Sequence, residues 1–219
     1  MLAHYFKIAT RNLLKYKQQT AISIVGLAIG FTCFALSMLW IRYEMGYDNF
    51  HEGAERIFVV RTEDKMSNDG LSLVTPSPLA AYLQETFPEI EYACNIIGYK
   101  NEIKYNGTIY PVFQFAADSV SMHIFPIQVI QGNFNFITNK GEIALTEEMA
   151  EKLFGKENPI GKTVRMSGKD ISVCAVVKSW GKHSNLPFDI ISANDQYPYW
   201  SASGWQTFIR LREKTDKHL

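Results

Sequence analysis

The chain has 219 residues, enough for one or two compact domains, and its 22 basic and 22 acidic residues leave no net charge. Residues 1–41 carry four basic residues and no acidic one, so residues 42–219 hold the other 18 basic and all 22 acidic residues. The larger part therefore has a net charge of −4, which argues against nucleic-acid binding because that function needs a basic surface.

Residues 2–18 predict an amphipathic helix, because apolar residues such as Phe6 and Leu13 recur at helical spacing and basic residues recur every four positions. One apolar and one basic side suit a helix that lies in the inner membrane interface. Two other interpretations stay open: docking on a cytoplasmic partner, and a charged leader that only sets orientation. The basic residues that we expect at the membrane interface are Lys7, Arg11, Lys15 and Lys17.

The longest apolar stretch, residues 21–41, contains no charged residue and no proline. At 1.5 Å per residue it forms a helix of about 31 Å, close to the roughly 30 Å thickness of the hydrocarbon layer. A buried core helix of this length is disfavoured, because globular helices rarely bury all sides over such a run. A cleaved signal peptide is disfavoured too, because its apolar core spans only about 7–15 residues and ends at a small-residue cleavage site. We therefore predict an uncleaved transmembrane helix.

The basic residues before this helix place the N-terminus in the cytoplasm and the following domain on the other side of the membrane. Trp40, Tyr43 and Tyr47 would then lie at the outer headgroup level, where aromatic side chains are enriched. The orientation of the whole chain is thus predicted from its first 47 residues.

Small residues mark one side of the predicted membrane helix. Gly26 and Gly30 form a G-x-x-x-G pair, and Ser23 and Ser37 add small polar surface. Small side chains four residues apart let a second helix approach closely. We therefore predict that Gly26, Gly30 and Ser23 pack against another membrane helix.

A strand–helix–strand unit follows the membrane helix and a short connector. Residues 57–62 and 91–99 predict strands. Between them, Ser77 and Pro78 have the residue types of an N-cap and a first helical position, and Pro88 ends the helix.

The next region is rich in predicted strands. Asn106 and Gly107 are the strongest short hairpin signal and lie between strands at 102–105 and 108–115. The same residues begin a glycosylation sequon, but the turn explains them better. Thr146 predicts the cap of a helix that ends at Gly155. Further strands are predicted at 127–131, 142–145, 162–166, 171–177 and 206–212.

No stretch carries the pattern of a catalytic, cofactor or metal site. Residues 155–163 resemble a phosphate loop, but five residues instead of four separate the first glycine from Gly-Lys-Thr. The segment also leaves a helix and enters a strand, the reverse of a phosphate loop. The histidines at positions 4, 51, 123, 183 and 218 lack metal-ligand spacing. His183, Ser184 and Asp189 supply triad residue types without a nucleophile elbow. We expect no catalytic residue, cofactor or metal.

Two further sets of residues have two interpretations each. Cys94 and Cys174 fall in predicted strands; two separate buried thiols are favoured, and a disulfide stays open because spacing alone does not fix a bridge. An aromatic group in a polar loop region is either a partner surface or a contact between two halves of the domain. Its members are Tyr197, Tyr199, Trp200 and Trp205.

Four stretches resemble the N-terminal part of MacB/FtsX-like ABC transporter permeases, especially the Bacteroidetes-type members. They are RNLLKYKQQTAISIVGLAIGF, YEMGYDNFHEGAERIFVVR, TPSPLAAYLQETFPEI, and EIALTEEMAEKLFGKENPIGKTV with SVCAVV after it. The resemblance covers essentially all 219 residues in the order found in the family.

The resemblance implies an α+β fold, in which one N-terminal transmembrane helix precedes a mixed α/β periplasmic domain. The implied parts are a cytoplasmic or interfacial helix at 1–18, the transmembrane helix at 19–43 and a MacB-like periplasmic core domain at 44–219. Within the last part, a porter-like βαβ subdomain would take residues 54–100 and 204–219, and an inserted strand-rich subdomain residues 101–203.

The resemblance also implies a non-catalytic subunit of the cell inner membrane. Its partners would be a cytoplasmic ABC ATPase, another permease chain in a homo- or heterodimer, and membrane lipid. ATP-driven changes would pass through the membrane helices to the periplasmic domain, where a substrate of open identity is moved or released. Because family permeases continue with further membrane helices, we expect an N-terminal fragment or a reduced form. The competing interpretation is a single-pass, membrane-anchored binding or scaffold module without transport activity.

Overall fold

The structure is a computed structural model that describes residues 2–46, 53–65, 67, 70–181, 184 and 186–213. The chain divides into two compact units, residues 1–47 and residues 48–219. Tyr47, His51, His183 and His218 lie outside the described residues, as do the side chain of Lys7 and the predicted porter residues beyond 213.

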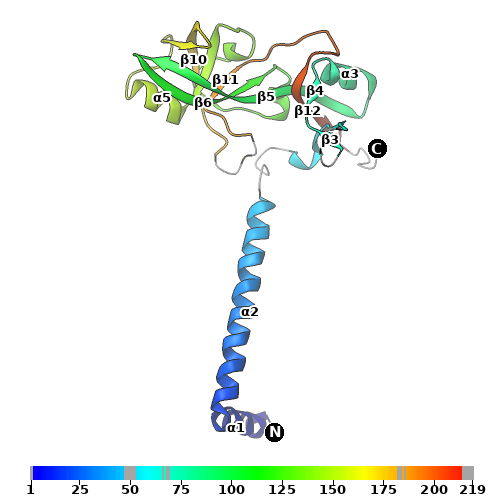
Figure 1. The fold of residues 1–219 in the computed structure, drawn as a ribbon, viewed down its shortest axis with the longest axis vertical. Helices are drawn as coiled ribbons and strands as arrows, with labels where there is room; N and C mark the ends of the chain where they lie inside the picture. Colours follow the sequence, from blue (N-terminus) through cyan, green and yellow to red (C-terminus); the bar gives the residue numbers. More distant parts are fainter. Residues whose placement is uncertain are drawn as a thin grey trace. The chain divides into compact units, whose positions relative to one another are not determined.

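The first unit consists of two helices, α1 (Leu2–Lys15) and α2 (Lys17–Glu44). The backbone leaves the helical region at Tyr16, where φ is −107° and ψ is 53°, so the single predicted helix at 2–18 ends three residues early (Figure 1). Across this bend, the Thr20 hydroxyl donates a hydrogen bond of 3.1 Å to the Leu13 carbonyl. By length and composition α2 can cross a membrane, and none of its residues is buried.

The second unit contains one large mixed sheet. Its hydrogen-bonded order is β1-β12-β5-β6-β11-β8-β10-β7, with β4 beside β12, and β9 beside both β10 and β5. Within the described residues these ten strands are β1 (Ile57–Val59), β4 (Thr75–Pro76), β5 (Ile90–Tyr105), β6 (Thr108–Ala117), β7 (Val129–Gly132), β8 (Glu142–Thr146), β9 (Thr163–Met166), β10 (Lys169–Val177), β11 (Ile190–Ala193) and β12 (Ser203–Leu211). A separate pair is formed by β2 (Thr62–Glu63) and β3 (Leu71–Ser72).

Short helices lie at opposite ends of this sheet, with α3 (Leu79–Thr86) beside β5 and β12, and α5 (Glu147–Phe154) beside β8 and β10 (Figure 1). A single helical turn, α4 (Ser121–Ile124), and two 3₁₀ turns, η1 (Ala54–Arg56) and η2 (Asn135–Ile137), complete the described helical segments. The two ends are named below as the α3 end and the α5 end.

The predicted hairpin is confirmed, because Asn106 and Gly107 have φ of 49° and 80° and join β5 to β6. Two positive φ values define the type I′ turn, which matches the twist of the strands. The separate strands predicted at 91–99 and 102–105 are wrong, because β5 pairs with β6 without a break from Ile96 to Tyr105. The predicted subdomain boundary at residue 101 thus falls inside one strand, and the division into two subdomains stays a prediction.

The two predicted helix starts have different outcomes. At α5 the Thr146 hydroxyl accepts a hydrogen bond of 3.3 Å from the Met149 amide, and the helix ends before Gly155 at φ of 62°, as predicted. At α3 the predicted Ser77 cap is wrong, because Pro78 occupies the N-cap position and no side chain caps the helix. The Ser77 hydroxyl instead accepts a hydrogen bond of 2.8 Å from the Tyr197 amide.

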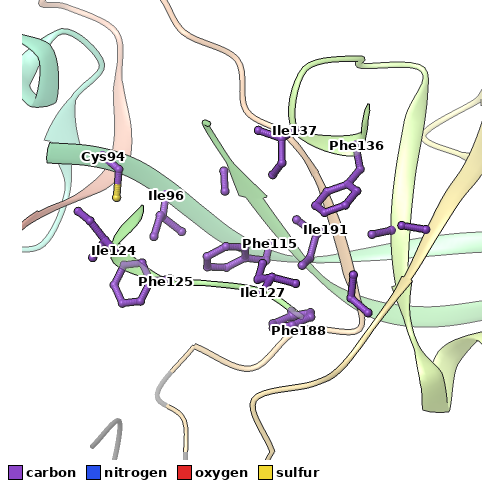
Figure 2. Packing of buried hydrophobic residues seen from close by; sticks show 14 of the residues in the cluster. Cys94, Ile96, Phe115, Ile124, Phe125, Ile127, Phe136, Ile137, Phe188 and Ile191 are labelled. Atoms are coloured by element: carbon purple, nitrogen blue, oxygen red, sulfur yellow. The ribbon is translucent and has the colours of Figure 1, made fainter. Parts of the chain in front are cut away.

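The largest apolar core lies along the middle of the sheet. Phe115 is only 1% exposed, and its ring contacts those of Trp180 and Phe188 edge-on or tilted at centroid distances of 5.3 and 5.9 Å. Figure 2 shows the side chains of this cluster meeting between the sheet and the segments that cross it. A second core packs α5 against β8 and β10, and a small third core lies under α3.

Candidate functional site

The first strand after the membrane helix lies beside the last strand of the sheet. β1 and β12 are antiparallel, with Ile57 opposite Arg210 and Val59 opposite Phe208. β12 in turn pairs with β5, from Gln206 opposite Ile96 to Leu211 opposite Ile90. A displacement of residues 53–56 would therefore reach three adjacent strands through backbone hydrogen bonds.

A charged cluster of Arg56, Glu91 and Arg210 fixes this edge. Arg56 Nη1 lies 3.3 Å and Arg210 Nε 3.2 Å from Glu91 Oε2, and Arg210 Nη2 donates to Glu91 Oε1 at 3.3 Å. Arg56 also donates to the Leu211 carbonyl at 3.1 Å, and Arg210 to the His123 carbonyl at 2.6 Å. Charge-assisted, two-pronged contacts of this kind resist sliding, so the cluster holds η1, β5, β12 and α4 in one arrangement.

The predicted helix-packing residues lie on an uncovered surface of α2. A Cβ atom built on Gly26 or Gly30 would meet no atom within 4 Å, and Ser23 is exposed. Trp40 and Tyr43 are exposed too, with their rings 6.3 Å apart, as are Arg11, Lys15 and Lys17. The structure thus leaves this surface open for a second helix and lipid, and the packing itself stays a prediction.

Polar side chains cross-link the α3 end of the sheet, and all of them except Asn194 and Gln196 are buried. This polar junction consists of Thr75, Ser77, Asn95, Asp118, Asn194, Gln196 and Thr207. Asn95 lies at its centre: its Nδ2 donates to the Ser77 carbonyl at 2.6 Å, and its Oδ1 accepts from the Thr207 hydroxyl at 2.8 Å. A buried polar group without such partners costs about 1–3 kcal/mol, so the junction selects one arrangement of its segments.

The junction fastens the segment 194–202 to the sheet at several points. Asn194 Nδ2 donates to the Asn95 carbonyl at 3.1 Å, and Gln196 Nε2 donates to Asp118 Oδ2 at 3.3 Å. The Ser77 amide donates to the Ala202 carbonyl at 2.8 Å, in addition to the contact between Ser77 and Tyr197. This segment has no regular structure, and hydrogen bonds set its position.

Asp118 is a buried carboxylate within the junction. Burial raises the pKa of Asp118, whereas hydrogen bonds from the amides of Ser121 and Asn95 and from Gln196 oppose that rise. The Ser121 amide donates to Oδ1 at 2.8 Å and the Asn95 amide to Oδ2 at 3.3 Å. The carboxylate thus accepts hydrogen bonds from protein donors while no cation lies against it in the described contacts.

A cleft of about 570 Å³ opens between α3 and the fastened segment, and is named here the α3 cleft. Its volume falls in the range of about 300–1,000 Å³ that is typical of ligand pockets. The remaining wall is small or apolar, formed by prolines, alanines, Val120 and Tyr197. Its polar lining residues are Ser77, Gln84, Glu85, Asn95, Asp118 and Gln196.

The predicted aromatic group divides into one core residue and three surface residues. Trp205 is 7% exposed and its indole donates to Asn194 Oδ1 at 2.9 Å, so it belongs to the framework beneath. Tyr197, Tyr199 and Trp200 are 45%, 64% and 54% exposed. Trp200 lies edge-on to Tyr82 of α3 at 5.6 Å, whereas Tyr197 alone of the three lines the α3 cleft.

Sequence reasoning did not identify the junction residues or Glu85. One local signal existed, because Asn95 is a polar residue inside the apolar strand run of Ala93, Cys94 and Ile96. Asp118 and Gln196 carry no such signal, since 77 residues of chain separate them and only the fold brings them together.

Two cysteines and one histidine lie among packed side chains of the sheet unit. Cys94 and Cys174 are free and buried, so the favoured prediction of two separate thiols is confirmed. Burial raises the pKa of both thiols, that of Cys174 to about 11, so both stay protonated near neutral pH. His123 stacks on Tyr92 at 4.6 Å, and no group of three His, Cys, Asp or Glu residues in the described part could hold a metal ion.

A family model of the MacB-like periplasmic core domain matches residues 20–218. The chain belongs to this family. Its members are components of ABC transporter permeases, generally non-catalytic, which work with an ATPase partner. The matched residues include most of α2 and the described sheet unit, so both parts belong to a permease-family protein.

Three solved structures share this fold. A domain of a permease protein from Porphyromonas gingivalis has a TM-score of 0.63 at 17% identity, covering 76% of this chain and 79% of the other. The extracellular domain of the noncanonic ABC-type transporter YknZ from Gram-positive bacteria has 0.55 at 15%, covering 71% and 83%. The periplasmic region of MacB from Actinobacillus actinomycetemcomitans has 0.56 at 11%, covering 79% of each. No match was found among curated proteins.

Proposed function

We propose that this MacB-like chain transmits ATP-driven conformational change from a cytoplasmic ATPase to a periplasmic domain, for efflux or release of a substrate. Its N-terminus lies in the cytoplasm, α2 crosses the inner membrane, and the sheet unit lies in the periplasm. The observation that carries the proposal is the edge formed by β1, β12 and β5, because residues that follow the membrane helix are fastened there to the longest strand of the sheet.

The edge is suited to transmission because its contacts are stiff. Arg56, directly before β1, is tied to Glu91 near the start of β5 and to the carbonyl of Leu211 at the end of β12. β5 then extends over 16 residues and pairs with β9 at Ile103 and Lys104, beside the α5 end. A displacement of η1 would therefore be carried along β5.

The membrane helix serves as the moving element in this proposal. Its Gly26, Gly30 and Ser23 surface packs against another helix of the permease assembly, either in a second copy or in a related chain. Arg11, Lys15 and Lys17 contact the inner headgroups, and Trp40 and Tyr43 contact the outer headgroups. The subunit itself needs no catalytic group, because hydrolysis takes place in the ATPase.

Co-purification tests the proposal. The tagged full chain is extracted from membranes of its own host in mild detergent, and bound proteins are identified by mass spectrometry. We expect an ABC ATPase and a permease chain, and we expect a variant with Gly26→Ile and Gly30→Ile to lose the permease chain. Ala28→Ile with Ala35→Ile is the matched control, because at 100° per residue these positions lie on the opposite side of the helix.

Recovery of the chain without an ATPase or a second permease chain, in native and variant forms alike, would contradict the proposal. That result would favour the single-pass binding or scaffold module.

A further inference from the structure

A recess lies on an exposed face of the sheet where β9, β5 and β6 are neighbours, and is named here the basic recess. Its volume is about 680 Å³, within the range of about 300–1,000 Å³ that is typical of ligand pockets. Lys100 and Lys104 of β5 and Arg165 of β9 line it, and Glu102 is the one acidic residue of the described lining. Three positive charges and one negative charge leave a net charge of +2 on a lining within a part of the chain that carries −4.

Two of these cations face each other without a negative partner. Lys104 lies directly opposite Arg165 in the antiparallel pair of β5 and β9. Like charges at such positions destabilise a sheet, because the Cβ atoms are only about 4.5–5.5 Å apart. Asp170 lies opposite Arg165 on β10, but among the described residues no ion pair joins Lys104 or Arg165 to a carboxylate. An anion between the two cations would remove this repulsion.

We propose that the basic recess binds the phosphate group of a phosphate monoester, which lies between Lys104 and Arg165. Such a group carries a charge of about −1.5 to −2 at pH 7 and has three acceptor oxygens, so one group can contact both cations. Guanidinium and ammonium groups form strong, charge-assisted hydrogen bonds to phosphate. The proposal goes beyond the transmission function and does not rest on it, because the recess is complete within one chain.

Glu102 limits the ligand to one compact anionic group. Alternate residues of a strand point to the same face, so Lys100, Glu102 and Lys104 form a row along β5. Positions two residues apart are separated by about 7 Å, which places the carboxylate midway between the two lysines. A chain of phosphates that extended from Lys104 to Lys100 would pass this carboxylate and be repelled. The recess therefore suits a single phosphate group rather than a polyanion.

Apolar residues lie beside the position of the phosphate. In the register of β5 and β6, Ile109 is opposite Lys104 and Pro111 is opposite Glu102. Both line the recess, and Ile109 is 57% exposed. An apolar substituent on the phosphate would cover this surface, and burial of apolar area contributes about 25 cal/mol per Å². Inorganic phosphate would leave the surface exposed, so the lining favours a monoester with an apolar part.

Hydrogen bonds hold one side of the recess in place. Ser167 and Gly168 form the turn between β9 and β10, with φ of 50° and 79°, and both line the recess. Asn101 Nδ2 donates to Ser167 Oγ at 3.4 Å and to Gln114 Oε1 at 2.7 Å. Gln114 Nε2 donates in turn to the buried Ser192 Oγ at 2.7 Å. The turn is thus attached to the interior of the sheet, and a wall that is already ordered loses little conformational entropy on binding.

Isothermal titration calorimetry of the full chain, in micelles of a neutral detergent at neutral pH, tests the proposal. The ligand is phenyl phosphate. The control ligand is benzenesulfonate, which has the same ring and three oxygens but one negative charge. We expect saturable binding of phenyl phosphate that weakens with added salt, and at least about tenfold weaker binding of benzenesulfonate.

Two changes in the lining should have opposite effects. Lys104→Gln with Arg165→Gln should weaken binding of phenyl phosphate at least about tenfold, because both charge-assisted contacts are lost. Glu102→Gln should strengthen it about two- to threefold, because a repelling carboxylate is removed. Lys156→Gln with Lys178→Gln is the matched control, since it removes two charges at exposed positions outside the lining and should leave binding unchanged. Thermal unfolding of each variant checks that the fold is retained.

Dihexanoyl phosphatidic acid, a short-chain lipid with a phosphate monoester, separates two sources of the same group. Displacement of phenyl phosphate by lower concentrations of this lipid would identify a lipid headgroup, and weaker or no displacement a water-soluble ester. The proposal is overturned if phenyl phosphate does not bind saturably, if benzenesulfonate binds equally well, if the Lys104 and Arg165 double variant binds like the native chain, or if Glu102→Gln fails to strengthen binding. None of these results bears on the ATPase partner, so failure here is distinct from failure of the proposed function.

Discussion

The α5 end and the α3 end of the sheet are stabilised in different ways. At the α5 end, Met149, Ala150, Leu153 and Phe154 of one short helix are all buried in an apolar core against β8 and β10. At the α3 end, Ala80 is the one buried residue of a helix of the same length, and hydrogen bonds add to the small apolar core beneath it.

The difference matters for function because the two kinds of contact have different consequences. Apolar burial is non-directional and closes space, whereas a hydrogen-bond network fixes geometry and can leave a cleft beside it. The first strand, the charged cluster and the α3 cleft all lie at the polar end. In the proposed transmission, the α3 end therefore carries the coupling and the α5 end supports the sheet.

The largest effect on stability is expected in the α5 core. Leu145 is fully buried there, so Leu145→Ala should lower the free energy of unfolding by about 2–5 kcal/mol through lost contacts and a cavity. Leu145→Met nearly conserves volume and should cost less than about 1.5 kcal/mol. Thermal unfolding of the full chain in detergent measures both. Equal effects of the two changes would show that this core is not tightly packed.

A somewhat smaller effect is expected in the polar junction. Asn95→Ala leaves the Ser77 carbonyl without its side-chain donor and the Thr207 hydroxyl with Thr75 as its remaining side-chain partner, which should cost about 1–3 kcal/mol. Unlike Leu145→Ala, it should also increase proteolysis of residues 194–202, because Asn95 Nδ2 no longer holds Ser77, whose amide and hydroxyl bond Ala202 and Tyr197. If proteolysis of this segment were the same in both variants, the junction would not be what orders it.

The charged cluster should contribute less to the free energy of unfolding than the polar junction does. Glu91→Gln removes the charge shared by Arg56 and Arg210, whose side chains are 21% and 16% exposed. The expected loss is about 0.5–1.5 kcal/mol and should shrink at high salt, since the pairs are partly solvated. Arg212→Lys is the control, because that side chain bonds only the Pro88 carbonyl among the described contacts. A loss that does not depend on salt would point to packing instead of charge.

The smallest effect is a pH dependence that comes from Asp118. Burial raises the pKa of Asp118 in the folded state. At pH values between the unfolded and the folded pKa, the folded protein therefore holds a proton that the unfolded chain has released. Stability from this group is full below the unfolded pKa of about 3.9 and is lost as pH rises through the folded pKa. The native chain should therefore gain stability relative to Asp118→Asn as pH falls through that window. A difference between the two that stays constant with pH would contradict this assignment.

Local signals in the sequence predicted the α5 end and the hairpin. Thr146 and Gly155 bound a helix whose apolar residues recur at helical spacing, and Asn106 with Gly107 defines a turn without outside help. The long apolar run of α2 was equally readable. In each case the residues that determine the element lie within it or directly beside it.

The contacts at the α3 end could not be predicted, because the residues that form them are distant in sequence. Ser77 has the residue type of a helix cap, but its hydroxyl accepts a hydrogen bond from the backbone amide of Tyr197, 120 residues further along the chain. β11 has no counterpart among the predicted strands, because its first three residues are all buried between β6 and β8 and show no alternation. The α3 cleft likewise combines residues from α3, β5, the turn after β6 and the segment 194–202, which no local pattern links.

Hydrogen exchange of backbone amides tests the proposed transmission most directly. The full chain is purified with its ATPase, and exchange is compared between the nucleotide-free complex and the complex trapped with ATP and vanadate. We predict altered exchange in β1 and β12, at residues 57–59 and 203–211, with unchanged exchange in α5. Identical exchange at β1 and β12 in both states, in a complex that hydrolyses ATP, would contradict the claim that this edge carries the movement.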